Sequence, residues 1–233
     1  MSYKSKEKEL LTWLKSKIET DNTYQKVLTA FFFAKQYHSG TRQGGNIPEF
    51  QHQIEIMLDL IPFEKCMKNP VEVFTTVLLH DVVEDYGLND KIWEMNLSRL
   101  KILSPVMLSD ITDYFGKDTK KYVDNLSKSA DGVKKGSRVY YRNIGECDVS
   151  SIVKLGDRKN NLEAMLKVFP LDKQERYCKQ IKEHFFKMLN KAESLYPEQK
   201  EIYDYYRERF LNIISVVEEK FRNKSTPTIK VKM

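Results

Sequence analysis

The sequence predicts an all-α protein, a helical bundle, and three observations support this fold class. Only nine glycines and seven prolines occur among 233 residues, whereas a turn-rich β-architecture usually needs Gly, Asn or Pro at each hairpin. Apolar residues recur at helical spacing through most of the chain. Hydrophobic residues make up 41% of the sequence, which suffices for one sizeable core and argues against general disorder.

The order of the expected helices follows from where the apolar runs start and stop. Leu10, Leu14 and Ile18 recur at helical spacing and predict the first helix. Pro48 and Pro70 each stand where proline favours the first position of a helix. The expected helices cover residues 7–18, 22–37, 48–61, 70–86, about 91–103, 105–115, 118–128 and 148–167, and two long charged helices, interrupted at Pro197, fill 171–222.

We expect the helices to form a single domain. Residues 1–222 contain no internal repeat and no linker long enough to separate two domains. The Gly-containing segments 39–48 and 129–136 are expected to be loops within this domain. Residues 223–233 are polar and Lys-rich, so we expect a disordered tail there.

The charge pattern narrows the possible partners without fixing one. The formal net charge is +6, with 31% of residues charged and both signs interspersed. A pocket for a polyanionic small molecule and a Lys-rich composition without function both explain the surplus. Signatures of RNA-binding proteins are absent, so nucleic acid is not an expected partner. The oligomeric state cannot be deduced from the sequence.

Cysteines and hydropathy predict a soluble, cytoplasmic protein. Cys66, Cys147 and Cys178 are scattered without a C-x-x-C pair, which argues against a disulfide framework and for a reducing compartment. The first residues lack the apolar segment of a signal peptide. No apolar run approaches the roughly 18 residues that span a bilayer, so a membrane partner is not expected.

An imidazole and three carboxylates lie within six residues at the end of an apolar run. They are His80, Asp81, Glu84 and Asp85. In one continuous helix these positions share one side, and burying them unpaired would cost several kcal/mol per ion. A divalent cation would offset the negative charge. The alternative, a solvated acidic helix C-terminus, conflicts with the negative end of the helix dipole.

Two further residues complete a set of potential metal ligands. Asp157 lies in the apolar segment around Leu155 and Leu162 and precedes Arg158, so an internal Asp–Arg ion pair is the alternative for it. His52 follows the Gly-rich loop, where a hydrogen-bonded core histidine is the alternative. Two imidazoles and two carboxylates together form a nitrogen and oxygen set suited to Mn²⁺, Fe²⁺ or Zn²⁺.

The order His…His-Asp…Asp resembles the metal signature of HD-domain phosphohydrolases. AFFFAKQYHSGTRQGGNIPEFQH (30–52) is similar to the first motif of the RelA/SpoT-type hydrolase domain, which acts on the alarmones (p)ppGpp. LLHDVVEDYG (78–87) resembles its HD-x-V-E-D box. YFGKDTKKYVDNLSK (114–128) and VKLGDRKNNLEAM (153–165) are similar to its third and fourth motifs. The resemblance covers about residues 24–215.

The resemblance implies an all-α HD-domain bundle and assigns roles to residues by position. The implied metal ligands are His52, His80, Asp81 and Asp157, with Mn²⁺ as the expected cofactor. The implied catalytic acidic pair is Glu84 and Asp85. The residues implied to shape the nucleotide pocket are Arg158 and Asn161. Tyr177, with Lys173 one turn before it, matches a tyrosine that contacts the nucleoside. The chain looks closest to stand-alone small hydrolases of this class, many of them from phages and prophages.

The first loop departs from the family pattern. The family usually has an Arg-Lys pair there, whereas here Arg42 sits one place early and the lysine is missing. Arg42, Lys154 and Arg158 are candidates to neutralise charge on phosphate oxygens. A surface charge is the alternative for Arg42, a solvated helix face for Lys154, and a packing aromatic for Tyr177.

The sequence therefore predicts a metal-dependent hydrolase of a small-molecule nucleotide. Removal of the 3′-pyrophosphate from (p)ppGpp is the first hypothesis. The alternatives are an HD phosphohydrolase that acts on another nucleotide or cyclic-nucleotide signal, and a catalytically dead module that only binds a nucleotide.

Overall fold

Helix α9, Asp148–Val168, runs through the centre of the protein, and every residue from 149 to 157 is buried. The structure is a computed structural model that describes residues 2–42, 47–87 and 104–225. Helix α9 contacts α3, α4, α7, α8, α11 and α12. Buried residues of this helix therefore face several neighbours at once, which is how Asp157 comes to lie in the interior.

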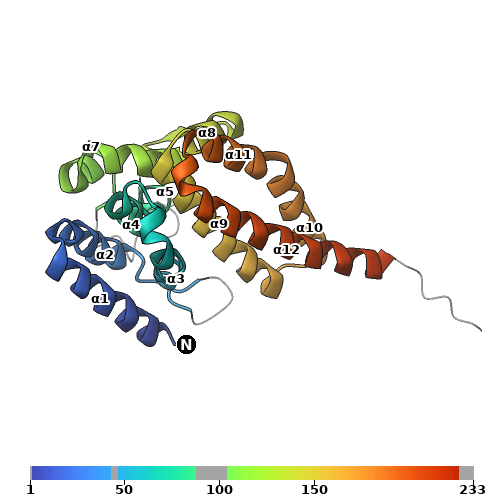
Figure 1. The fold of residues 1–233 in the computed structure, drawn as a ribbon, viewed down its shortest axis with the longest axis horizontal. Helices are drawn as coiled ribbons and strands as arrows, with labels where there is room; N and C mark the ends of the chain where they lie inside the picture. Colours follow the sequence, from blue (N-terminus) through green and yellow to red (C-terminus); the bar gives the residue numbers. More distant parts are fainter. Residues whose placement is uncertain (1, 43–46, 88–103, 226–233) are drawn as a thin grey trace, which may run out of the picture.

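The all-α prediction is confirmed (Figure 1). The α-helices are α1 (Tyr3–Thr20), α2 (Gln25–Tyr37), α3 (Gln51–Leu60), α4 (Pro70–Leu79), α5 (Val82–Tyr86), α7 (Leu108–Leu126), α8 (Ser137–Gly145), α9, α10 (Leu171–Gln180), α11 (Phe186–Leu195) and α12 (Lys200–Ser225). Short 3-10 turns are η1 (Asn22–Tyr24), η2 (Ile61–Cys66) and η4 (Pro197–Gln199), and η3 (Ile181–Phe185) is a turn of π-helix. The strands β1 (Ser129–Ala130) and β2 (Val133–Lys134) form one small antiparallel hairpin.

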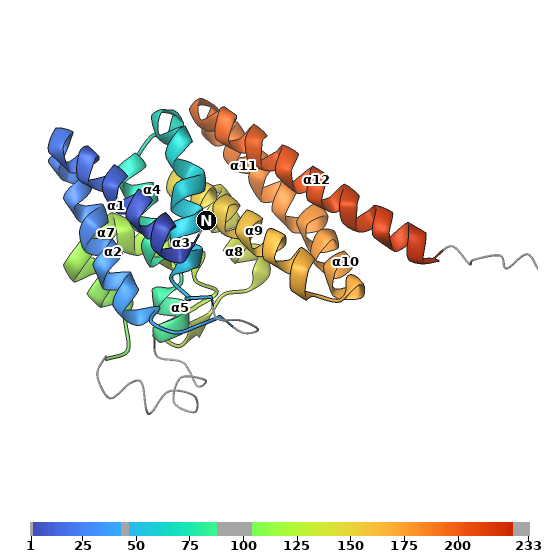
Figure 2. The same ribbon diagram turned by 90° about the horizontal axis from the view of Figure 1, so that it is seen from below.

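The helices are arranged on two sides of α9. In Figure 2, α1 to α4 lie on one side, while α10, α11 and α12 form a layer on the other. Helix α2 packs against α4, and α1 packs against α3. The last turns of α12 project beyond the rest of the protein in both views (Figures 1 and 2). Helices α3, α4 and α9 pack against one another. His52 lies on α3, His80 directly follows α4, and Asp157 lies on α9.

A glycine allows α3 to approach α9 closely. A Cβ atom placed on Gly156 would lie 2.7 Å from Cγ2 of Ile56 and 3.6 Å from Cδ1 of Leu60. Any larger residue would therefore push the two helices apart. Because His52 is one turn before Ile56 and Asp157 follows Gly156, this contact also sets the separation of these two side chains.

Helix 70–86 was expected to be continuous, but it is interrupted at His80 and Asp81. The His80 ring donates from Nδ1 to the carbonyl of Val77 over 2.8 Å. In an uninterrupted α-helix this carbonyl would accept from the Asp81 amide. The backbone interruption presents His80 and Asp81 at a junction between α4 and α5.

The region after α5 contains one confirmed boundary and two errors of prediction. The expected helix 91–103 lies outside the described residues. The break expected after residue 115 is present as a kink at Gly116, which has a φ of 87°, a backbone angle that glycine adopts without steric cost. Segment 129–136 was expected to be a loop but contains the β1–β2 hairpin, and helix α8 was not predicted.

The carboxyl-terminal helices follow the expected order. The break at Pro197 is confirmed, and between α10 and α11 the backbone stays helical through the wider π turn η3. Helix α12 continues to Ser225, beyond the end at 222 that was predicted for it. Residues 226–233 lie outside the described part.

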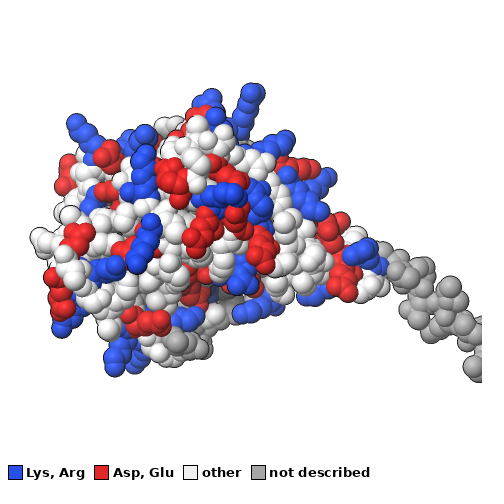
Figure 3. All heavy atoms as spheres, viewed as in Figure 1, with Lys and Arg blue, Asp and Glu red and all other residues white. Residues whose placement is uncertain are grey.

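The distribution of charged side chains on the surface and the hydropathy of the helices match what the sequence pattern predicts. Lysine, arginine and acidic side chains are interspersed over the face shown in Figure 3. Among the described residues, no helix combines the length and the apolar character needed to cross a membrane.

Candidate metal centre and adjoining cavity

Four predicted ligands converge from three helices. His52 is in the first turn of α3, His80 and Asp81 form the α4–α5 junction, and Asp157 lies in the middle of α9. One potential ligand atom each of His52, His80 and Asp81 lie within 4.8 Å of one another. Asp157 adjoins this group, with Oδ1 3.3 Å from Nε2 of His52 and 3.9 Å from Nε2 of His80.

The distances among these atoms suit one shared cation. Asp81 Oδ2 is 3.1 Å from His80 Nε2 and 3.9 Å from His52 Nε2. Ligand atoms bound at about 2.0–2.2 Å to one metal ion lie roughly 3–3.5 Å apart. The observed separations are at or slightly above this range, so a small inward movement would close the set around an ion.

The hydrogen bonds of both imidazoles leave Nε2 as the free nitrogen. Nδ1 of His80 faces the carbonyl oxygen of Val77, which can only accept, so Nδ1 carries the proton. Nδ1 of His52 lies 2.7 Å from Oδ1 of Asn160, which likewise can only accept. In a neutral ring the proton on Nδ1 leaves a lone pair on Nε2, which is the form that binds metals.

The two Nε2 atoms are buried and unsatisfied. In the described part of the chain, neither atom has a hydrogen-bond partner, although buried polar groups rarely remain unpaired. The Nε2 atoms of His52 and His80 face the carboxylates of Asp157 and Asp81. Burial opposes protonation of His80, but in the absence of a cation the negative charges of Asp81 and Asp157 raise its pKa to about 9, so that its Nε2 holds a proton. A divalent cation would replace this proton between the imidazoles and the carboxylates, and nitrogen and carboxylate oxygen donors suit Mn²⁺, Fe²⁺ or Zn²⁺.

Asp157 is further held by residues of its own helix. Its Oδ2 accepts from Nζ of Lys154 over 2.6 Å, and its Oδ1 accepts from Nδ2 of Asn161 over 2.5 Å. The alternative of an Asp157–Arg158 ion pair is wrong, because Lys154 is the partner. Lys154 is buried, so a solvated face is also wrong for this residue. Burial disfavours its charge, yet Asp157 raises the pKa of Lys154.

The predicted acidic pair lies on α5, one turn beyond the ligands. Oε2 of Glu84 accepts from the backbone N–H of Lys128 over 2.7 Å, which fixes Glu84 against the segment before β1. Asp85 is exposed to solvent and does not line the cavity described below. The protein around Asp85 partly desolvates its carboxyl, and the charges of Asp81 and Glu84 repel it, so its pKa is raised.

A cavity of about 930 Å³ opens beside the candidate metal centre. His52 and Asp157 contribute to its wall. Five of the six predicted substrate-binding residues also line it: Arg42, Lys154, Arg158, Asn161 and Tyr177. Lys173 does not line the cavity. Its Nζ lies 3.5 Å from the centroid of the Phe169 ring, and Phe169 is part of the wall.

Arg42 and Arg158 are held in place by different means. The Arg42 amide donates to the carbonyl of Ile47, and Thr41 pairs with Pro48, so the base of this loop is fixed. The Arg158 guanidinium lies 5.5 Å from the Phe185 ring centroid. Its Nη2 donates to the Tyr141 hydroxyl over 3.4 Å.

Several residues of the site were not predicted from the sequence. Lys6, Glu55, Lys128, Asn160, Lys167 and Phe169 line the cavity as well. Lys128 was part of the third quoted motif and Asn160 of the fourth, so a signal existed for these two. Lys6 and Glu55 carry no local signal, because they reach the site only through the packing of α1 against α3.

Comparisons with known proteins give no match to this chain: no model of a protein family matches it, and neither does any curated protein.

Proposed function

We propose that the protein is a metal-dependent phosphohydrolase of nucleotides that carry several phosphates, with Mn²⁺ as the cofactor. The observation that carries this proposal is the pair of buried Nε2 atoms of His52 and His80, which have no hydrogen-bond partner among the described residues and face two carboxylates. A cavity of nucleotide size with cationic walls lies next to them.

The first component of the proposed site is the set of metal ligands. His52, His80, Asp81 and Asp157 would hold the cation. A bound divalent cation supplies Lewis acidity, which lowers the pKa of water and neutralises phosphoryl oxygens.

The acidic pair would handle the proton of the attacking water. Asp85 has a raised pKa, which suits a group that takes up a proton near neutral pH. Glu84, fixed through Oε2 by the Lys128 amide, would orient the water. Their position one turn after His80 and Asp81 keeps both carboxylates next to the ligands.

The cavity walls suit a nucleotide with separate phosphate and base ends. Arg42, Lys154 and Arg158 would neutralise the charge that grows on phosphoryl oxygens in the transition state. Phe169 and Tyr177, whose ring centroids are 5.7 Å apart, provide aromatic surface for a base.

Within this class we propose (p)ppGpp as the substrate and removal of its 3′-pyrophosphate as the reaction. The resemblance of four sequence motifs to the RelA/SpoT-type hydrolase domain supports this choice. Water would add to the phosphorus next to the 3′ oxygen and that P–O bond would break, which gives pyrophosphate and GDP or GTP.

A panel of nucleotides tests the proposal. Purified protein with Mn²⁺ is incubated with ppGpp, pppGpp, cyclic nucleotides, dNMPs and NTPs, and the products are separated by chromatography. We expect GDP and pyrophosphate from ppGpp. Turnover of a different member of the panel would identify that nucleotide as the substrate in place of ppGpp. Binding without any turnover would indicate a module that only binds nucleotides.

A further inference from the structure

A chain of hydrogen bonds connects His52 to the amino-terminal helix. Nδ1 of His52 lies 2.7 Å from Oδ1 of Asn160, and Nδ2 of Asn160 donates to Oε2 of Glu55 over 2.8 Å. Oε1 of Glu55 accepts from Nζ of Lys6 over 2.5 Å and from Nε2 of Gln51 over 2.7 Å. The chain thus crosses three helices: α3, α9 and α1.

The chemistry of these groups allows only one assignment of donors and acceptors along this chain of hydrogen bonds. The Lys6 ammonium can only donate, and the Glu55 carboxylate that it pairs with can only accept. Asn160 must therefore turn its NH₂ group toward Glu55, because the opposite orientation would place the amide oxygen against a carboxylate. The amide oxygen of Asn160 then faces Nδ1 of His52, which must carry the proton.

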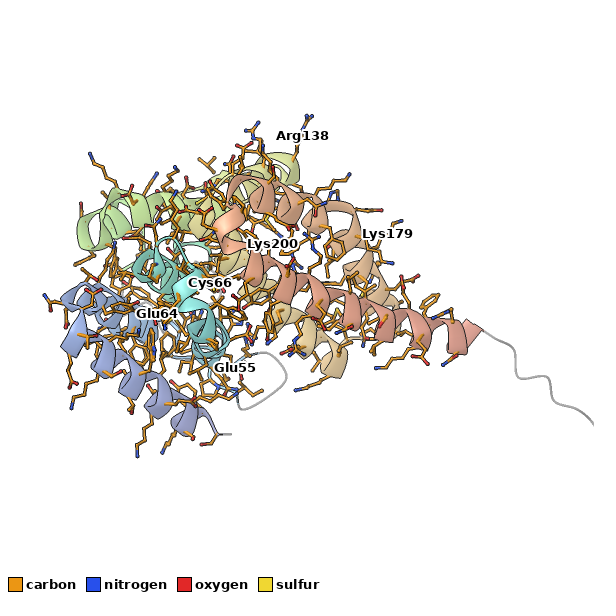
Figure 4. The ribbon with its side chains drawn as sticks, in the orientation of Figure 1. Glu55, Glu64, Cys66, Arg138, Lys179 and Lys200 are labelled. Carbon is orange, nitrogen blue, oxygen red and sulfur yellow. The ribbon has the colours of Figure 1, made fainter. Side chains whose placement is uncertain are left out.

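The outer residues of this hydrogen-bond chain are largely shielded from solvent and lie beside the cavity. Glu55 lies on α3 near the amino-terminal end of α1 (Figure 4). The side chains of Lys6 and Glu55 are only 22% and 28% exposed, and both line the cavity. A neutral histidine without such partners is free to protonate Nε2 instead, and that form cannot bind a metal through Nε2.

We propose that Asn160 and Glu55 are positioning residues that hold His52 with its proton on Nδ1 and its Nε2 lone pair directed at the metal centre, and that Lys6 anchors Glu55 from α1. The importance of this tautomer rests on the proposed function, since it prepares His52 as a ligand. Through Lys6, docking of the amino-terminal helix contributes to metal affinity.

The first readout is the tautomer of His52 in metal-free protein. Nitrogen-15 chemical shifts of the imidazole rings distinguish Nδ1–H from Nε2–H at alkaline pH, and with four histidines in the chain, His52→Gln identifies the signals. We expect wild-type His52 to carry its proton on Nδ1. In Asn160→Ala and in Glu55→Ala, the Nε2–H form should appear.

The second readout is Mn²⁺ affinity, measured by titration calorimetry. Loss of a partner that orients a metal ligand usually costs about 10- to 100-fold in affinity, and we expect this loss in Asn160→Ala. Lys6→Met should weaken binding by a smaller factor. Asn212→Ala, an exposed substitution on α12, should leave both readouts at their wild-type values.

An exchange of the two partners separates positioning from packing. Asn160→Asp alone places two carboxylates against each other and should weaken Mn²⁺ binding. In the double variant Asn160→Asp with Glu55→Gln, the new amide at position 55 can donate to one oxygen of the new carboxylate at position 160, while the other oxygen accepts from His52. The double variant should therefore show the Nδ1–H tautomer and recover most of the affinity that Asn160→Asp loses.

Two results would overturn the proposal. One is an unchanged His52 tautomer in both Asn160→Ala and Glu55→Ala, which decides the matter whether or not the protein binds a metal. The other is wild-type Mn²⁺ affinity in Asn160→Ala despite an altered tautomer. A wild-type protein that binds no Mn²⁺ would overturn the proposed function separately.

Discussion

Gly156 of α9 contacts Ile56 of α3 so closely that a methyl group on Gly156 would lie 2.7 Å from Ile56 Cγ2. Asp157 follows Gly156 and His52 is one turn before Ile56, and Oδ1 of Asp157 lies 3.3 Å from Nε2 of His52. Packing of the two helices and geometry of the candidate metal centre are thus set by the same contact.

Gly156→Ala should therefore damage both the fold and the site. Overpacking of a filled core usually costs about 1–3 kcal/mol, and we expect a loss of this size in the free energy of unfolding measured with urea. Mn²⁺ affinity should fall too, because α3 must move away from Asp157. Gly136→Ala is the matched control, because nothing lies within 4 Å of a Cβ there. Equal stability of both variants would contradict the prediction.

Helical periodicity predicted most of the fold because amphipathic spacing reports burial directly. It failed at His80–Asp81, where the His80 side chain bonds to the carbonyl of Val77 and no pattern of apolar residues encodes that bond. The β1–β2 hairpin had a signal, Asp-Gly at 131–132, and the structure gives both residues positive φ.

The site was predictable only as far as its residues lie in recognisable segments. His80, Asp81 and Asp157 stand at the end or in the middle of strongly apolar runs, which made them conspicuous, whereas His52 could be placed only by its position after the Gly-rich loop. The partners of His52 were not predictable, since Glu55 is an ordinary helical glutamate and Lys6 an ordinary surface lysine until α1 packs on α3. Which cation Asp157 pairs with was also undecidable, because Lys154 and Arg158 are both adjacent on the helix.

Removal of a metal ligand should abolish metal binding without abolishing the fold. Elemental analysis of the wild-type protein should give about one transition-metal ion per chain. His80→Ala and Asp157→Ala should lose it, because each deletes one donor of the set. His184→Ala is the control, since His184 is exposed at the α10–α11 junction. Full activity after exhaustive chelation would contradict the role of the metal.

The acidic pair should be separable from the ligands by experiment. Glu84→Gln and Asp85→Asn keep the size of each side chain but remove its charge. If these residues act on water, metal content should stay near one ion per chain, while turnover should fall about 10²-fold or more, the usual scale for loss of a general base. Metal loss as large as in His80→Ala would instead identify them as ligands.

His38 should make the stability of the protein depend on pH. This histidine is 5% exposed, and burial lowers its pKa from the usual value near 6.5 to about 4, against the opposing effect of Asp81. Between these values the unfolded chain holds a proton that the native state lacks, so stability falls as pH falls through 6.5 and stops falling near pH 4. The contribution is about 3 kcal/mol at most.

Urea unfolding of metal-free protein at pH 5 and 7.5 measures this dependence. In His38→Gln the difference in unfolding free energy between the two pH values should be smaller than in the wild-type protein by about 2 kcal/mol. His184→Gln, at an exposed position, should leave the difference unchanged. If the difference in His38→Gln equals that of the wild-type protein, His38 must be as fully protonated in the native state at pH 5 as it is in the unfolded chain.

Arg42 and Tyr177 line the same cavity, and we expect them to bind opposite ends of the nucleotide. A charge-assisted hydrogen bond to a phosphate contributes about 1.5–3 kcal/mol, so Arg42→Ala should raise KM by roughly 10- to 100-fold. It should lower kcat by less, as loss of uniform binding does.

Base stacking contributes about 1–3 kcal/mol, so Tyr177→Ala should weaken the binding of purine nucleotides about as much as Arg42→Ala does. The metal content should stay unchanged. Tyr177→Phe decides how Tyr177 acts, because stacking survives in this variant and a hydrogen bond from the hydroxyl does not. Lys179→Ala is the control, since Lys179 (labelled in Figure 4) is on α10 but lines a separate groove with Glu218 and Phe221. Unchanged KM values for the best substrate in both Arg42→Ala and Tyr177→Ala would mean that Arg42 is a surface charge and Tyr177 a packing residue. The phosphates would then have to be bound by the remaining cations of the cavity, Lys128, Lys154 and Arg158.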